Sequence, residues 1–249
     1  MNKFFAILAI LLSPLSSQAS IKAIVFDVFG TTVDWRTNII AEGQALGKSH
    51  NIEVDWPEFA DAWGQAYGAS VDQVRRGVLP WMSLDELHRR SLETLLDEFE
   101  VSGLSEAEKN HFSTVWHRLS PWPDSVEGLN RLRLKFKIAP LSNGNVSLLT
   151  DLAAFAHLPW DYILSAEEVH RYKPDPKVYL YAVEHFGLQP EEVMMVAAHP
   201  GDLTVPRKLG MKTAYIHRPY AGSPAIPPRK GEFDFIVQNF LELADQLYF

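Results

Sequence analysis

Short apolar runs alternate with amphipathic stretches along most of the chain. Residues 21–28 form the first such run, and its unbroken apolar character is typical of a strand buried on both faces. Further strands are predicted at residues 136–141, 162–164, 193–197, 213–216 and 235–237, with helices at 125–134, 147–156, 176–186, 203–209 and 240–248. Strands that alternate with helices predict an α/β fold built on a doubly wound parallel sheet.

One long stretch, residues 32–121, has no strand pattern. Apolar residues recur there at helical spacing, which predicts helices at 36–49, 56–76, 83–99 and 105–119. Two of these helices open with the residue pairs of a capping box, Ser83 with Glu86 and Ser105 with Glu108. The sequence therefore predicts a helical cap over residues 36–119, inserted into a core domain of residues 20–35 and 120–249.

The first nineteen residues differ from the rest. Lys3 is their only charge, Phe4–Leu12 is apolar throughout, and Ser17 and Ala19 supply small residues at a cleavage site. This pattern is typical of a signal peptide cut after Ala19, and the apolar segment is too short to span a bilayer. We expect export to the periplasm or the medium, with no stable membrane insertion after the signal is removed.

Composition excludes several classes of function. A net charge of −8 argues against a nucleic-acid partner, because there is no basic surface to meet phosphates. Cysteine is absent, which excludes disulfides, thiolate metal sites and a cysteine nucleophile. The tryptophans of the predicted cap could form the apolar surface of a homodimer, although packing inside the cap explains them equally well: Trp56, Trp63, Trp81 and Trp116.

Polar residues follow the predicted strands where the strands end. They are Asp27 and Thr31, then Ser142 and Asn143, then Lys173 in the loop before the helix at 176, and finally His199 and Asp202. In a parallel sheet the carboxyl ends of the strands share one edge, where ligands bind. Each residue also has a structural explanation, since acids cap helices and Ser-Asn-Gly forms turns. Their convergence on one edge favours a functional site.

Four segments in this order resemble the motifs of the haloacid dehalogenase-like superfamily. They are Phe26-Asp27-Val28-Phe29-Gly30-Thr31, Leu141-Ser142-Asn143-Gly144, Tyr172-Lys173-Pro174-Asp175 and Val196-Ala197-Ala198-His199-Pro200-Gly201-Asp202-Leu203. The resemblance runs from Ile21 to the C-terminus. It implies a Rossmann-like core, and the helical insertion is similar to the cap of the first subclass.

Phe29 indicates the branch. Phosphatases of this superfamily carry a second aspartate at this position, whereas L-2-haloacid dehalogenases carry an aromatic residue. Tyr179 also looks like the tyrosine of the dehalogenase branch, as does the stretch from Leu79-Pro80-Trp81 to Asp85-Glu86-Leu87-His88-Arg89. The resemblance thus implies a hydrolytic (S)-2-haloacid dehalogenase whose partner is a small 2-haloacid, with no metal and no cofactor.

The implied roles suit the residue types. The carboxylate of Asp27 would attack C2 of the substrate, and the Lys173 ammonium would keep that carboxylate ionised. Thr31, Ser142 and Asn143 would donate hydrogen bonds to Asp27 or to the substrate carboxylate, while Phe29 and Tyr179 would complete the substrate site.

The resulting ester must then be hydrolysed, and His199 is the best candidate for the base that activates water. An imidazole base is usually oriented by an acidic partner. Glu42 on the first cap helix and Asp202 are the two candidates for that role.

One segment departs from the dehalogenase pattern. The branch carries an arginine after the tryptophan of the second cap helix, but here Trp63 is followed by Gly64 and Gln65. Gln65 is expected to contact the substrate, and Gly64 would enlarge the pocket. Three other residues could supply the positive charge that the missing arginine would provide: Arg36, Arg75 and Arg76.

Two other functions compete with dehalogenation. A metal-dependent phosphatase would share Asp27, Lys173 and Asp202, although Phe29 has no carboxyl group for the leaving group. An exported binding protein could keep the fold and have lost turnover through Gly64.

Overall fold

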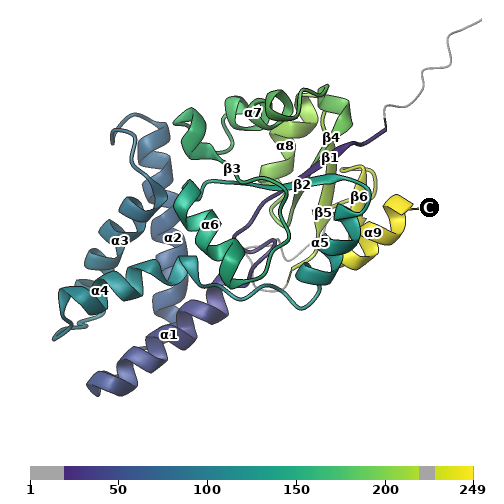
Figure 1. Ribbon diagram of the computed structural model, residues 1–249. Coiled ribbons are helices and arrows are strands. Elements are labelled where there is room, and N and C mark those ends of the chain that lie inside the picture. Colours follow the sequence, from purple (N-terminus) through teal and green to yellow (C-terminus); the bar gives the residue numbers. More distant parts are fainter. Residues whose placement is uncertain (1–19, 219–227, 249) are drawn as a thin grey trace, which may run out of the picture.

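The computed structural model describes residues 20–218 and 228–248 (Figure 1). The signal peptide predicted at residues 1–19 lies outside the described residues, so it and the export that it implies stay predictions. Among the residues described, no helix combines the length and the apolar character that a membrane span requires.

Six parallel strands form one sheet in the order β3-β2-β1-β4-β5-β6. The predicted parallel sheet is therefore confirmed. The strands are β1 (Ala23–Phe26), β2 (Lys137–Ser142), β3 (Leu164–Ser165), β4 (Val193–Ala197), β5 (Lys212–Ile216) and β6 (Phe235–Val237). Every residue of β1 and β4 is buried, which explains why these segments are apolar without alternation.

Helices cover both faces of the sheet. Figure 1 shows α7 and α8 on one side of the strands and α5 and α9 on the other. The core helices are α5 (Ser125–Arg133), α6 (Val146–Phe155), α7 (Pro176–Phe186), α8 (Gly201–Lys208) and α9 (Phe240–Tyr248), with short 3-10 turns η2 (Ala166–Val169) and η3 (Pro190–Glu192). Helix α8 begins two residues earlier than predicted, so Asp202 lies in its first turn instead of preceding it.

A second group of helices lies to one side of the sheet (Figure 1). These are α1 (Trp35–His50), α2 (Trp56–Arg75), α3 (Leu84–Glu98), α4 (Glu106–Ser113) and the 3-10 turn η1 (Thr114–His117), which we call the cap. Both predicted capping boxes are present. The helix predicted at 105–119 is shorter, because its α-helical part ends at Ser113 and the chain tightens into η1.

The cap tryptophans mostly pack inside the chain. Trp56, Trp63 and Trp116 are at most 5% exposed, and only Trp81 is half-buried. Packing within the cap thus accounts for three of the four residues. A homodimer stays a prediction without support from these side chains.

The position of β1 determines where polar residues meet. β1 pairs with β2 on one side and with β4 on the other, and Phe26 lies level with Pro140 and Val196 in the two neighbours. The residues that follow these three parallel strands therefore leave the sheet at the same edge. A strand order that reverses at this point opens a crevice at the carboxyl edge.

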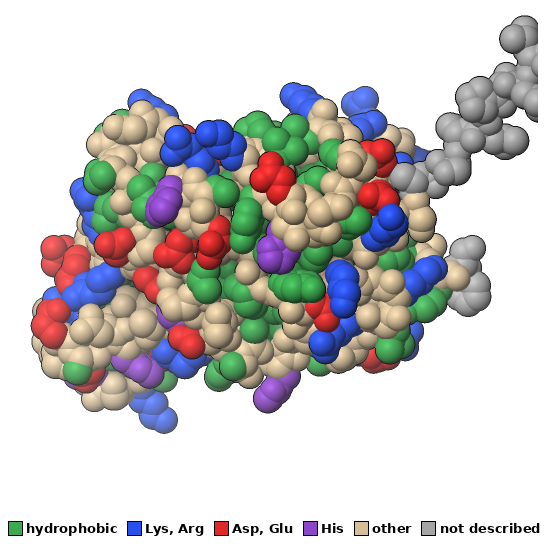
Figure 2. All heavy atoms as spheres, turned by 45° about the horizontal axis from the view of Figure 1, so that its top comes forward, with side chains coloured by type: hydrophobic (Ala, Val, Ile, Leu, Met, Phe, Trp, Pro, Cys, Tyr) green, Lys and Arg blue, Asp and Glu red, His purple; other side chains and the backbone are tan. Residues whose placement is uncertain are grey.

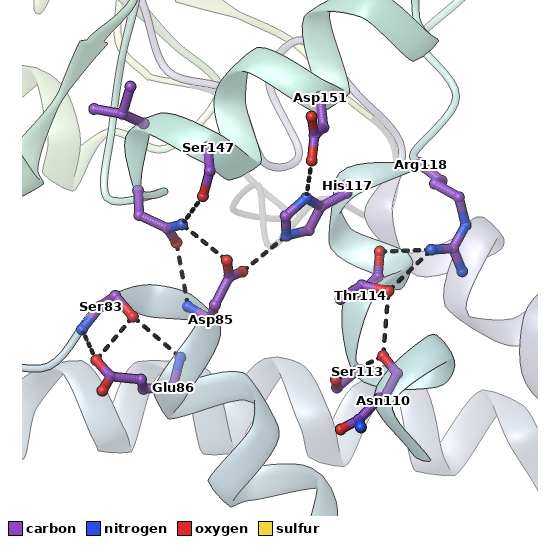
Figure 3. Close-up of polar contacts among 12 residues, drawn as sticks. Ser83, Asp85, Glu86, Asn110, Ser113, Thr114, His117, Arg118, Ser147 and Asp151 are labelled. Carbon is purple, nitrogen blue, oxygen red and sulfur yellow. Dashed lines mark hydrogen bonds and ion pairs between the residues drawn. The ribbon is translucent and has the colours of Figure 1, made fainter. Parts of the chain in front are cut away.

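His117 joins the cap to the core. Its Nε2 lies 3.0 Å from Oδ1 of Asp85 on α3, and its Nδ1 lies 2.8 Å from Oδ2 of Asp151 on α6 (Figure 3). Asn145, the residue before α6, donates to the other Asp85 oxygen at 2.8 Å. Burial lowers the pKa of His117, but its hydrogen bonds to both carboxylates outweigh this effect and raise the pKa above its ordinary value. Since each ring nitrogen faces a carboxylate, the protonated imidazole, with two N–H donors, is the form that this bridge between cap and core favours.

We expect His117→Gln to reduce the free energy of unfolding by about 1–2 kcal/mol near pH 6, because it removes charged hydrogen bonds. A raised pKa in the folded state gives stability that is complete below the unfolded pKa and is lost as pH rises through the folded pKa. The difference in the free energy of unfolding between wild type and variant should thus become smaller towards pH 9. Urea unfolding at several pH values measures it.

His111→Gln is the matched control, because His111 lies in the same cap and its side chain is 66% exposed. It should change stability little at any pH. A His117→Gln effect that is independent of pH would contradict the charged bridge.

Candidate active site

Asp27 leaves β1 at the centre of the sheet edge. Its backbone N–H donates to the Val196 carbonyl at 2.9 Å, which fixes the first residue beyond the strand. The chain then turns at Gly30, whose φ of 81° suits glycine. This turn brings the Thr31 hydroxyl back to donate to Oδ2 of Asp27 at 2.7 Å, and the same hydroxyl accepts from the Ala198 N–H at 2.9 Å. Asp27 is thus held at the base of a crevice and is 8% exposed.

Lys173 lies between two carboxylates. Its Nζ is 3.0 Å from Oδ1 of Asp27 and 2.5 Å from Oδ2 of Asp202. Its backbone N–H donates to the Asn143 side-chain oxygen at 2.8 Å, which links the loop before α7 to the end of β2. Oδ1 of Asp202 accepts from the Tyr179 hydroxyl at 2.5 Å. The predicted convergence of residues from four separate segments is present.

The two acids that share the Lys173 ammonium have pKa values shifted in opposite directions. Burial raises the pKa of Asp27, but the charge of Lys173 and contacts with His199 and Thr31 hold it well below its usual range. Burial dominates at Asp202 and raises its pKa despite the charge of Lys173. Burial lowers the pKa of Lys173, yet both carboxylates bring it above its ordinary value. The carboxyl group of Asp27 therefore ionises more readily than that of Asp202.

His199 reaches Asp27 from the end of β4. Its Nδ1 lies 3.3 Å from Oδ2 of Asp27, on the oxygen that also accepts from Thr31. The imidazole is 35% exposed, whereas Asp27 is almost buried. Both side chains line the same open space.

That open space is a cavity of about 780 Å³ between the cap and the core. Phe29 lines it, with its ring edge-on to Trp116 at 5.6 Å. The predicted residues Gln65 and Asn143 also line it. Sequence reasoning missed Trp35, Asp61, Tyr67, Gly68 and Trp116, which complete much of the wall. Among the described residues, no group of three or more His, Asp or Glu side chains is placed to hold a metal ion.

Comparison with known proteins agrees with this geometry. The family model described as haloacid dehalogenase-like hydrolase matches residues 21–209. (S)-2-haloacid dehalogenase 1 of Pseudomonas sp. (strain CBS-3) is 30% identical over 201 residues, which cover 80% of this chain and 85% of that protein. The chain belongs to the haloacid dehalogenase-like hydrolase family. The resemblance drawn from the motifs is therefore confirmed.

Two solved structures of this family are similar over most of their length. The defluorinating L-2-haloacid dehalogenase Rha0230 is 40% identical with a TM-score of 0.87, covering 92% of this chain and 96% of that one. The L-2-haloacid dehalogenase PA0810 is 44% identical, also with a TM-score of 0.87, covering 92% and 99%. These relatives belong to the branch that Phe29 indicated.

Two expected site residues lie elsewhere. Glu42 pairs with Arg118 at 3.1 Å and with His111 at 3.0 Å, because its position on α1 faces the turn that ends the cap. The prediction that it orients His199 is not borne out by this placement. Ser142 is fully buried, its hydroxyl accepts from the Gly144 N–H at 3.2 Å, and it is not part of the cavity lining. Ser142 thus supports the turn that carries Asn143.

Aromatic rings pack against Gly64, the position at which the resemblance implies an arginine. A Cβ added to Gly64 would lie 2.6 Å from Cη2 of Trp35. The Trp35 ring in turn stacks on Trp116, with centroids 5.9 Å apart and planes 21° apart. Gly64 does not enlarge the pocket, contrary to expectation, because the indole of Trp35 occupies the space beside it.

Each of the three arginines considered as a replacement has an acidic partner. Arg36 forms two hydrogen bonds to the Asp61 carboxylate, at 2.6 and 2.7 Å. Arg75 and Arg76 lie 3.6 and 3.5 Å from the carboxylate of Asp72. The three arginines are not among the residues that line the cavity of Asp27.

The stack continues into the cap through His88. Its ring lies 4.0 Å from that of Trp116 and nearly parallel to it, and Tyr67 stacks on it at 5.7 Å. Burial lowers the pKa of His88 to about 3, so this imidazole is neutral. Tyr67 accepts from the Asn143 amide at 2.9 Å, which ties the stack to the edge of the sheet.

We expect Gly64→Ala to lower the free energy of unfolding by about 1–3 kcal/mol, because Trp35 must leave its stacked position. Gly68, one turn along α2, is the matched control, since a Cβ there meets nothing within 4 Å. Gly68→Ala should be neutral or stabilising by up to about 1 kcal/mol, as alanine favours the helix. Urea unfolding of both variants measures this, and equal effects would contradict the role given to Trp35.

Proposed function

We propose that the protein hydrolyses short (S)-2-haloacids to (R)-2-hydroxyacids and halide. The observation that carries the proposal is a buried, ionised Asp27 that faces an aromatic cavity, with Phe29 in place of a second acid. Curated relatives named (S)-2-haloacid dehalogenase support it, as do the two structures named L-2-haloacid dehalogenase. The proposed reaction uses no metal and no cofactor.

In the first step an oxygen of Asp27 attacks C2 of the substrate. The new C–O bond forms as the carbon–halogen bond breaks, and the halide leaves with the bonding electron pair, which inverts the configuration at C2. Halide needs no proton to leave, so Phe29 is compatible with this step. Lys173 and Thr31 hold the carboxylate in place for attack, 3.0 and 2.7 Å from its two oxygens.

In the second step water attacks the carbonyl carbon of the Asp27 ester. His199 is the proposed base, because its Nδ1 already lies 3.3 Å from the carboxyl group that becomes the ester. It takes one proton from the water, and the bond between Cγ of Asp27 and the ester oxygen breaks. That oxygen, derived from Asp27, leaves on C2 of the hydroxyacid and receives the proton from His199. The second proton ends in solvent, so the overall products are hydroxyacid, halide and H⁺.

Asp202 and Tyr179 act through Lys173 in this proposal. Both oxygens of Asp202 accept hydrogen bonds, one from Lys173 and one from Tyr179. Asp202 thereby aims the ammonium at Asp27 and compensates part of its charge. Tyr179 is a positioning residue here, since its hydroxyl is directed at Asp202.

Halide release tests the function directly. The panel contains fluoroacetate, chloroacetate, both enantiomers of 2-chloropropionate and 2-chlorobutyrate, and fluoroacetate is included because one relative is named as defluorinating. We expect the wild type to release halide continuously from the S enantiomer. Asp27→Asn should release none, and His199→Ala should release about one equivalent per enzyme and then stall as the ester accumulates.

Each competing function gives its own result. Turnover of a generic phosphoester with Mg²⁺ that stops with EDTA, together with no halide release, would establish the phosphatase. No halide and no phosphate release would favour the binding protein. Continuous turnover by His199→Ala would remove the proposed base while leaving Asp27 as nucleophile.

A further inference from the structure

The cavity of Asp27 has little surplus positive charge for an anionic substrate. Lys173 faces the two carboxylates of Asp27 and Asp202, and Asp61 in the cavity wall is paired with Arg36. The whole chain carries a net charge of −8. A 2-haloacid, which is ionised at neutral pH, must therefore be attracted by a local positive field if it is to concentrate at this site.

A second cavity, of about 650 Å³, adjoins the first, and Pro174 lines both. One wall comes from the end of α2 and the following loop, and the other comes from the loop between η2 and α7. We call this cavity the arginine cleft, and its lining residues include Arg75, Arg76, Trp81, His170, Arg171 and Asp175. The arginine cleft thus lies between cap and core. Two of its lining residues, Tyr172 and Pro174, are the sequence neighbours of Lys173.

Positive charge exceeds negative charge in the arginine cleft. Arg75 and Arg76 share the single carboxylate of Asp72, and Arg171 lies 3.7 Å from Asp175. Three guanidinium groups therefore face two carboxylates. Charge-assisted hydrogen bonds are typically about 2.7–2.9 Å long, so these ion pairs of 3.5–3.7 Å are loose. Lys and Arg side chains gather at the upper left of Figure 2, where the end of α2 meets the core.

The arginine cleft also has an apolar wall. Trp81 is half-buried, and its ring lies 4.7 Å from that of Tyr172 and 5.3 Å from that of His170. A small carboxylate with a short carbon chain could contact the guanidinium groups and the aromatic rings at once. The proposed substrate has both of these parts, a carboxylate and a short carbon chain.

The arginine cleft is connected to the catalytic residues through the backbone. Its lining residues Tyr172 and Pro174 flank Lys173 in the sequence, and the Lys173 ammonium contacts Asp27 and Asp202. Of the three arginines, Arg75 acts on the Tyr179 hydroxyl that donates to Asp202, because its positive charge lowers the pKa of Tyr179 against the larger effects of burial and Asp202.

We propose that the arginine cleft is an anion-binding vestibule that holds small carboxylates weakly and passes them across Pro174 to the cavity of Asp27. As a route for substrate it rests on the proposed function, whereas its affinity for carboxylates does not. Arg76 and Arg171 are the residues to change, because their side chains are 70% and 54% exposed and neither touches the Asp27 network in the described structure.

The kinetic test compares Arg76→Gln/Arg171→Gln with Arg131→Gln/Arg133→Gln, which removes the same charge from α5. We expect the vestibule variant to lose about 3- to 10-fold in kcat/KM for (S)-2-chloropropionate at low ionic strength, with kcat within twofold of wild type. The loss should vanish in about 0.5 M of a bulky buffer salt, because salt screens exposed charges. The control should follow wild type throughout, and equal behaviour of the two variants would overturn the vestibule.

A binding measurement separates the cleft from the reaction. Propionate is the probe, because it carries the substrate's charge and cannot react. Its titration is followed at the Trp81 indole N–H resonance, which Trp81→Phe assigns. We expect that resonance to shift in wild type and in the α5 control but not in Arg76→Gln/Arg171→Gln.

The two failures are distinct. A wild type that releases no halide, yet shows the Trp81 shift, would contradict the proposed function and keep the carboxylate site. Halide release without any Trp81 shift at about 100 mM propionate would overturn the vestibule and leave dehalogenation in place.

Discussion

One ammonium shared by two buried carboxylates is the interaction on which the site depends. Lys173 lies 3.0 Å from Asp27 and 2.5 Å from Asp202, so a single positive charge serves two acids that burial alone would tend to protonate. Their environments then diverge. Thr31 and His199 add hydrogen bonds to Asp27 and stabilise its charge, while Asp202 accepts from Lys173 and from the Tyr179 hydroxyl. A carboxylate that stays ionised where water is scarce is a strong nucleophile.

The sheet makes this arrangement possible. Asp27, Asn143 and His199 follow three adjacent strands at one edge of the sheet, and the loop before α7 supplies Lys173. The cap lines the opposite side of the cavity mainly with aromatic rings. Trp35 lies over Gly64, and Trp116 and His88 continue the stack. The cavity thus has charged residues on the side of the sheet and aromatic residues on the side of the cap, and the arginine cleft adjoins it.

Local sequence patterns predicted well which residues gather at the edge of the sheet. Strands read from apolar runs placed Asp27, Asn143 and His199 at one edge, since the topology of a parallel sheet leaves few alternatives. The capping pairs Ser83–Glu86 and Ser105–Glu108 located two cap helices because capping is a local interaction. Phe29 distinguished between branches from a single position.

Contacts between distant segments could not be predicted in this way. Glu42 was assigned to His199, but its partners His111 and Arg118 come from residues about seventy positions later. Gly64 looked like an empty space because nothing in its own helix shows that Trp35 of α1 packs against it. The sequence around His117 carries no signal for its role, since both its partners lie on other helices. Helix orientation, which sequence periodicity leaves open, decides all three.

The origin of the product oxygen tests the central claim most directly. Enzyme in excess over (S)-2-chloropropionate is incubated in H₂¹⁸O for a single turnover, and the lactate and the peptide that contains Asp27 are analysed by mass spectrometry. If the Asp27 carboxylate attacks C2, the lactate carries ¹⁶O and the label enters Asp27. Lactate labelled with ¹⁸O in the first turnover, with unlabelled Asp27, would contradict the account, because water itself would then have displaced the halide.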